Sequence, residues 1–129
     1  MPKPNITASE LDVMTVLWDS AQPLPASAIA QVLADTKEWS PRTVNTLLAR
    51  LADKNAVTTS KDGRRYLYAP LVTKQDYAEG SAGTLIDKLF GGRTAPLVAQ
   101  LAEARGLSDK DIQEIQNILE RLKAKGENQ

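Results

Sequence analysis

The chain contains neither cysteine nor histidine. Without cysteine it forms no disulfide, no thiolate metal site and no thiol nucleophile. Without histidine it lacks imidazole general bases and the usual ligands of zinc. No cluster of paired carboxylates and no activated lysine or serine stands in their place. We therefore expect no enzyme, no metal site and no cofactor.

Long hydrophobic runs are also missing. No apolar run approaches the roughly 18 residues of a membrane-spanning helix, and Met1–Asn5 holds no apolar segment of a secretory signal. Apolar residues still make up 42% of the 129 residues. That is enough for the core of one ordinary domain, or of a small domain with an appended module. We expect a cytoplasmic protein with no membrane insertion.

The formal net charge is zero, which at first sight argues against nucleic-acid binding. The charges are unevenly distributed, however. Residues 1–39 carry two cations and five acids, a net of −3, whereas residues 40–69 carry six cations and two acids, a net of +4. A basic patch is therefore expected within residues 40–69.

Two helices are predicted before this patch. Thr7 and Glu10 have the spacing of a capping box, so a helix begins after Thr7, and Gln22–Pro25 is expected to end it. A second, short helix is expected up to about Thr36. Its apolar face is formed by Ile29, Val32 and Leu33.

A third helix is predicted from Ser40 to about Lys54. Ser40 is its N-cap, Pro41 its first residue, and Asn55 a suitable left-handed residue after its end. Thr43 stands where a capping box has an acid, so the first turn carries no carboxylate. A helix start of this kind can approach a phosphate group.

The two sides of this third helix differ in chemistry. Its apolar stripe is formed by Val44, Leu47, Leu48 and Leu51. Its opposite side is formed by Arg42, Thr46 and Ala49, flanked by Thr43, Asn45 and Arg50. Arginine can bind guanine, asparagine can bind adenine, threonine can bind phosphate or touch a thymine methyl, and alanine permits close approach. This side therefore suits the major groove of DNA.

A hairpin follows directly. Strands are predicted at Val57–Ser60 and Arg65–Ala69, around the turn Asp62-Gly63. Which face packs inward stays open, because Leu67 and the two neighbouring tyrosines fall on opposite faces. Three cations gather at the tip, namely Lys61, Arg64 and Arg65. Like charges there repel one another and add little to folding, whereas a phosphate partner explains them. A helix followed by a basic hairpin is typical of a winged helix-turn-helix DNA-binding domain.

Two alternatives remain. For a single helix, exposed cations more often merely solvate a surface, and it is the basic hairpin that shifts the balance towards DNA. The winged helix could also serve as the scaffold of a protein-interaction adaptor that does not bind DNA.

The composition shifts after residue 72, which divides the chain into a winged-helix domain (1–72) and a C-terminal helical region (73–129). Helices are predicted at about 73–90, at 95–104, and from Ser108 onwards. Their apolar residues could pack on the first domain or form a two-fold dimer. We favour the dimer, since the first domain looks complete. The expected dimerisation residues are Leu85, Leu89, Leu97, Leu101, Ile112, Ile115, Leu119 and Leu122.

Several motifs carry a resemblance to a known family. They are Ile6-Thr7 with Glu10, Val16-Leu17-Trp18, Trp39 to Val44 with Thr46-Leu47-Leu48 and Arg50-Leu51, and Tyr66-x-Tyr68-x-Pro70-Leu71-Val72. In these motifs the chain resembles the penicillinase-repressor family (BlaI/MecI/CopY type) of bacterial transcriptional regulators, over nearly its whole length.

The resemblance implies a mostly α protein, with an N-terminal winged helix-turn-helix followed by a helical dimerisation module. It implies a homodimeric repressor of transcription on a palindromic operator of double-stranded DNA. Contacts from the third helix would come from Ser40, Arg42, Thr43, Thr46 and Arg50, and the hairpin would contact phosphates.

Two departures limit what the resemblance implies. The copper-responsive branch uses a C-terminal Cys-x-Cys pair, which a chain without cysteine excludes. The β-lactam-responsive branch is inactivated by cleavage at an Asn-Phe bond, and the corresponding stretch here, Ala99-Gln100-Leu101, lacks that pair. We expect release by proteolysis or disruption of the dimer module. A membrane sensor protease is a candidate partner, and the cleavage position stays open.

Overall fold

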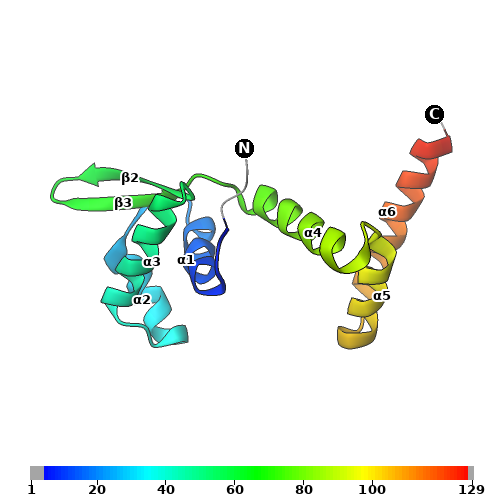
Figure 1. The fold of residues 1–129 in the computed structure, drawn as a ribbon, viewed down its shortest axis with the longest axis horizontal. Helices are drawn as coiled ribbons and strands as arrows, with labels where there is room; N and C mark the ends of the chain where they lie inside the picture. The colour runs from blue at the N-terminus through cyan, green and yellow to red at the C-terminus, as the bar shows by residue number, and fades with distance from the viewer. Residues whose placement is uncertain (1–4, 128–129) are drawn as a thin grey trace. The chain divides into compact units, whose positions relative to one another are not determined.

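The computed structural model describes residues 5–127 and divides into two compact units, residues 1–82 and 83–129 (Figure 1). Met1–Pro4, which include most of the N-terminal segment without an apolar run, lie outside the described residues. The elements are α1 (Ala8–Asp19), β1 (Leu24–Pro25), α2 (Ala26–Lys37), α3 (Pro41–Asp53), β2 (Val57–Asp62), β3 (Arg65–Pro70), α4 (Lys74–Phe90), α5 (Thr94–Arg105) and α6 (Asp109–Glu127). The predicted mostly α, winged-helix architecture is confirmed.

Helix α4 begins just after the boundary that the sequence predicts at residue 72. It then runs across the division between residues 82 and 83. The boundary of independently folding domains therefore stays a prediction.

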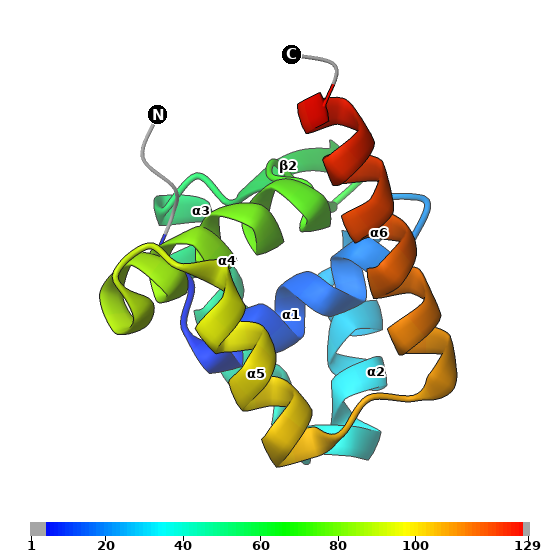
Figure 2. The ribbon, with the colours of Figure 1, turned by 90° about the vertical axis from the view of Figure 1, so that its right-hand side faces the viewer.

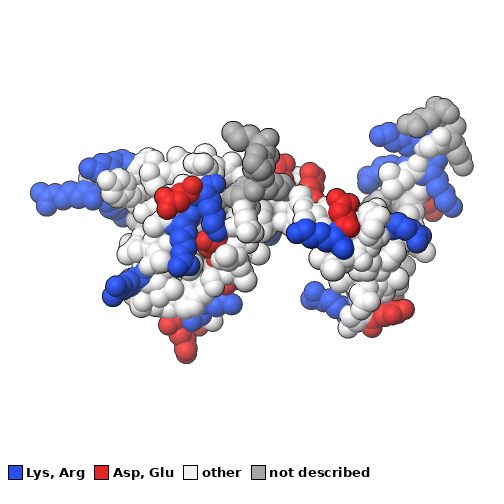
Figure 3. Space-filling view, in the orientation of Figure 1, with Lys and Arg blue, Asp and Glu red and all other residues white. Residues whose placement is uncertain are grey.

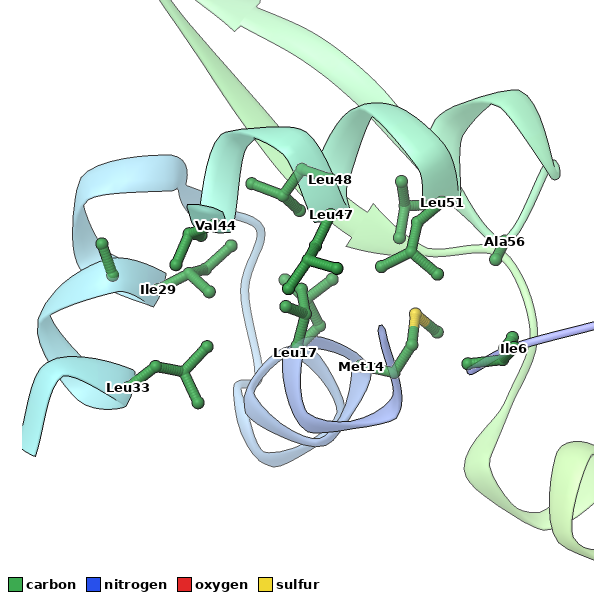
Figure 4. Close-up of a cluster of buried hydrophobic side chains, with 13 residues drawn as sticks. Ile6, Met14, Leu17, Ile29, Leu33, Val44, Leu47, Leu48, Leu51 and Ala56 are labelled. Atoms are coloured by element: carbon green, nitrogen blue, oxygen red, sulfur yellow. The ribbon is translucent and has the colours of Figure 1, made fainter. Parts of the chain in front are cut away.

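The core of the N-terminal unit lies between α1, α2 and α3 (Figure 4). Each helix contributes apolar residues at helical spacing, and their side chains point toward one another. The fully or almost fully buried members are Val13, Met14, Leu17, Ile29, Leu33, Val44, Leu47, Leu48 and Leu51. The predicted stripe of α3 thus faces the core. Val32, expected on the apolar face of α2, is instead 52% exposed, because it lies beside the stripe formed by Ile29 and Leu33.

Side-chain caps fix where α1, α3, α4 and α6 begin. The Thr7 amide donates to Glu10 Oε1 at 2.9 Å, and the Glu10 amide donates to Thr7 Oγ1 at 3.2 Å, which completes the predicted capping box. Thr73 and Ser108 cap α4 and α6 as predicted. The side-chain oxygen of each accepts an amide hydrogen bond of 3.0 Å from the residue three positions on.

The sheet contains a strand that the sequence analysis missed. Its order is β1-β3-β2, all antiparallel, with Leu24 of β1 opposite Tyr68 of β3. We expected Gln22–Pro25 only to end a helix. Two residues are too few to show the alternation typical of a strand, so the pairing becomes visible only once β3 passes alongside. Tyr68 packs against the core, which settles which face of the hairpin is turned inward.

The hairpin turn lies one residue later than predicted. Asp62 pairs with Arg65, so the two central turn residues are Gly63 and Arg64 rather than Asp62 and Gly63. Gly63 has φ of +66°, and Arg64 is not among the residues with positive φ. This is the pattern of a type II′ turn, which needs a positive φ only at its first central residue. Strand β2 extends further toward the tip than predicted, and strand β3 extends one residue further at the base of the hairpin.

The C-terminal unit contains the end of α4 together with α5 and α6. The segment of residues 106–108 connects α5 to α6 (Figure 2). None of the described side chains from residue 83 to residue 126 is buried. Among the described helices, none combines the length and apolar character needed to cross a membrane.

A buried ion pair anchors the end of α3 to the start of α1. Glu10 is fully buried, and its Oε1 accepts a hydrogen bond from Lys54 Nζ, directly after α3. The same ammonium donates to the Asn5 carbonyl at 2.7 Å. Oε2 of Glu10 has no hydrogen-bond partner in the described part of the chain. Burial acts to raise the pKa of Glu10, but the bonds from Lys54 and Thr7 together lower the pKa below its ordinary value.

This anchor predicts a pH dependence of stability. A carboxyl whose pKa is depressed by folding stabilises the folded state above its unfolded-state pKa, near 4.5. That contribution is lost as the pH falls through the lower folded-state pKa. We expect the difference in free energy of unfolding between the wild type and Glu10→Gln to shrink as the pH falls below 4.5, measured by urea unfolding. A difference that does not change with pH would contradict this account.

The core of α3 predicts a large effect of truncation. Leu48 is 0% exposed, so Leu48→Ala removes buried methyl groups and leaves a cavity. We expect a loss of about 2–5 kcal/mol in the free energy of unfolding. The matched control is Leu71→Ala, since Leu71 is 56% exposed and its truncation should cost less than about 0.5 kcal/mol. Equal losses in the two variants would show that α3 does not depend on this core.

Candidate nucleic-acid interface

The burial of its apolar stripe turns the opposite side of α3 to solvent. The predicted contact residues on this helix are all exposed, namely Ser40, Arg42, Thr43, Asn45, Thr46 and Arg50. Ala49 is exposed among them and adds no bulk. The structure therefore brings these residues together on one accessible face, and their contacts with DNA stay a prediction.

The first turn of α3 is held in a fixed conformation. Ser40 Oγ accepts a hydrogen bond from the Thr43 amide at 3.3 Å and lies 3.2 Å from Thr43 Oγ1. Thr46 Oγ1 donates to the Arg42 carbonyl at 3.0 Å. No acidic residue occupies this turn. The positive end of the helix dipole is therefore not neutralised by a carboxylate, which favours the approach of an anion.

The hairpin carries the second group of predicted contacts. Lys and Arg side chains gather at its outer end (Figure 3). Lys61 Nζ lies 5.6 Å from the centre of the Tyr66 ring, a distance that permits a cation–π contact. Arg65 donates to Asp62 Oδ2 at 3.1 Å, and both side chains remain more than half exposed. Arg64 is exposed at the turn itself.

One cation of the expected basic patch forms an ion pair within the protein instead of contributing to the patch. Lys54 was counted in the basic segment, but its ammonium is bound to Glu10 and to the Asn5 carbonyl. Of the six cations in residues 40–69, four have no carboxylate partner among the described residues, and these four together form what we call the basic face. These are Arg42, Arg50, Lys61 and Arg64.

A pocket of about 310 Å³ joins α3 to the hairpin and includes residues that the sequence analysis missed. It is lined by Pro25, Ala26, Ser27, Asn45, Arg65, Tyr66 and Tyr68. Helix α2 begins in this pocket, with no side-chain cap bond and no acid in its first turn. The absence of an acid there is visible in the sequence. The proximity to Asn45 and Arg65 is not, because it depends on how the sheet folds against the helices.

The family profile described as penicillinase repressor matches residues 6–121 of the chain. A penicillinase repressor of Bacillus licheniformis is 32% identical over 120 residues, which cover 93% of this chain and 93% of that protein.

Solved structures agree. The solution structure of the DNA-binding domain of the repressor BlaI is 36% identical, with a TM-score of 0.53, and covers 59% of this chain and 92% of that chain. The monomeric form of Bacillus licheniformis BlaI in complex with the blaP half-operator is also 36% identical, with a TM-score of 0.51 and the same coverage. The chain therefore belongs to the penicillinase repressor family, a family of DNA-binding transcriptional repressors rather than enzymes.

Proposed function

We propose that this protein is a sequence-specific repressor that binds its operator as a homodimer, with α3 in the major groove and the hairpin on the adjacent backbone. The observation that carries the proposal is the basic face. Its four cations lie on α3 and the hairpin, and none is neutralised by a carboxylate within the described chain. The BlaI structure in complex with a half-operator, at 36% identity, supports the same reading of this unit.

Helix α3 would supply base recognition. Arg42 lies at the exposed start of the helix, where a guanidinium can bond guanine O6 and N7 in bidentate fashion. Asn45 lies on the same exposed face and can pair with adenine. The Thr46 hydroxyl already donates to the Arg42 carbonyl, so its exposed oxygen can act as an acceptor towards DNA.

The hairpin and the pocket would supply phosphate contacts. Lys61 and Arg64 are exposed at the hairpin, where their charges can contact the phosphate backbone. Arg65 contributes more weakly, because Asp62 partly neutralises it. Ser27, at the acid-free start of α2, lies in the same pocket as Arg65 and extends this phosphate-binding surface.

The C-terminal unit would bind the same unit of a second copy. Its apolar residues stay exposed in the single chain, among them Leu89, Leu101 and Leu122. Burying them between two copies removes apolar surface from water and sets two α3 helices in a two-fold arrangement. The operator would then be palindromic, with half-sites about one DNA turn of ~10 bp apart, or a multiple of it.

Loss of the dimer would release the DNA. Ala99-Gln100-Leu101, the stretch that corresponds to the family's cleavage region, lies inside α5 and is exposed. A protease acts on extended backbone, so cleavage there requires local opening of the helix. A membrane sensor protease, or any event that separates the two copies, would serve this purpose.

The proposal predicts a steep dependence of DNA affinity on salt. A dimer that neutralises roughly 6–10 phosphates should lose ~10³–10⁵-fold in affinity between about 50 and 200 mM salt. Fluorescence anisotropy with an operator selected from a random DNA pool measures this directly. Failure to bind any DNA at low salt would reject the repressor and favour an adaptor.

Substitutions in α3 and in the hairpin should affect DNA binding in different ways. Arg42→Ala should cost ~1–3 kcal/mol of binding and relax the preference at one base position. Lys61→Ala should weaken operator and random DNA alike and reduce the salt slope by about one. The matched control is Arg105→Ala, which removes a cation from α5, outside the basic face. Equal effects of Arg42→Ala on operator and random DNA would rule out base reading by this residue.

A further inference from the structure

Tyr66 is a large aromatic side chain that the core of its unit does not cover. It is 52% exposed. Tyr68 lies two residues further on, and therefore on the same face of β3, but it packs against the core. The sheet face that packs inward at Tyr68 thus continues outward at Tyr66, toward the tip of the hairpin. A phenol combines an apolar ring with a polar hydroxyl, which suits a surface that binds a partner.

The ring of Tyr66 lies where α3 and the hairpin meet. Tyr66 lines the pocket of about 310 Å³ together with Asn45 of α3 and Ser27 at the start of α2. We assign base recognition to Asn45 and phosphate binding to Ser27 in the proposed function above. A duplex that contacts both of these surfaces has to pass close to Tyr66.

Tyr66 is also the direct neighbour of a cation of the basic face. Lys61 of β2 lies opposite Tyr66 of β3 in the register of the hairpin. The Lys61 ammonium lies 5.6 Å from the centre of the ring. A cation at this distance is attracted by the negative face of the ring, and this attraction restricts the positions of an otherwise flexible lysine side chain. The ring therefore holds the ammonium next to the pocket.

The hydroxyl of Tyr66 is available to a partner. No group in the described part of the chain forms a hydrogen bond with it. A phenolic O–H group is a hydrogen-bond donor, and tyrosine is among the side chains that bond phosphate oxygens of DNA. None of the residues that line the pocket is acidic, so no carboxylate of the lining repels an anion there.

We propose that Tyr66 is a DNA-contact residue with two roles. Its hydroxyl donates a hydrogen bond to a backbone phosphate at the pocket, and its ring positions the Lys61 ammonium for a neighbouring phosphate. This inference rests on the proposed function and adds a residue to the DNA-binding surface. Lys61 supplies the charge, whereas Tyr66 supplies a neutral donor and restricts where that charge lies.

Two substitutions in the full-length chain separate these roles. Tyr66→Phe removes the hydroxyl and keeps the ring. Its affinity for operator and random DNA alike should fall by roughly tenfold, as expected for a lost bond to a charged group. Its salt slope should not change, because counterion release depends on the cations. Tyr66→Leu also removes the ring, so its affinity should fall further and its salt slope should decrease toward that of Lys61→Ala.

Tyr77→Phe is the matched control. It removes the same hydroxyl from α4, outside the basic face, and should leave DNA affinity unchanged. An unchanged affinity of Tyr66→Phe would overturn the proposed hydroxyl contact.

A double-mutant cycle tests the positioning role. If the ring acts on DNA through the ammonium, Tyr66→Leu should cost less affinity in a Lys61→Ala chain than in the wild-type chain. Equal costs in the two chains would show that the ring and the lysine act independently, and would overturn the positioning role.

Fluorine NMR provides a readout that does not depend on affinity. The chain contains three tyrosines, so labelling with 3-fluorotyrosine gives three resonances, and the one missing from Tyr66→Phe belongs to Tyr66. This resonance should shift when the selected operator DNA is added, whereas that of Tyr77 should not. A wild-type chain that binds no DNA would overturn the proposed function and this inference with it. Binding to DNA without a shift at Tyr66 would overturn this inference alone.

Discussion

The burial of one stripe of α3 is the constraint on which the rest of the unit depends. Val44, Leu47, Leu48 and Leu51 are buried against α1 and α2, and this leaves only one rotation of the helix about its axis. Any other rotation would expose leucine and bury a guanidinium, at a cost of several kcal/mol. Packing alone therefore presents Arg42, Asn45 and Thr46 to solvent, and no separate device is needed to orient them.

A neutral chain can bind a polyanion because its charges are sorted by position. Two acids close to this region each form an ion pair with a cation outside the basic face. Glu10 is buried against Lys54, and Asp62 is paired with Arg65. No carboxylate among the described residues forms an ion pair with the four cations of the basic face. Electrostatic attraction to DNA acts over about 10 Å at ordinary salt, so this local field matters more than the net charge.

Most of the fold follows from local patterns in the sequence, and the exceptions depend on contacts between distant segments. Caps at Thr7, Ser40 and Ser108 act within three residues, so they can be recognised from spacing alone. The strand β1 and the bond between Lys54 and Glu10 join residues more than forty positions apart. Neither has a periodic signature. For the same reason the exposed face of α3 could be predicted from a helical wheel, whereas its junction with Ser27 and Arg65 could not.

The role that we propose for the C-terminal unit depends on the winged-helix unit that precedes it. A single winged helix presents one α3 and one hairpin, and its phosphate contacts alone bind DNA weakly at physiological salt. Joining two such units raises the overall affinity by roughly 10²–10⁴-fold without any new contact, provided that both can engage at once. The exposed leucines of the C-terminal unit fit the pairing that we propose, since burying them between two copies would remove apolar surface from water. In the dimer that we propose, breaking the pair would remove this whole gain in one step, and the winged helix would not need to change shape for the DNA to be released.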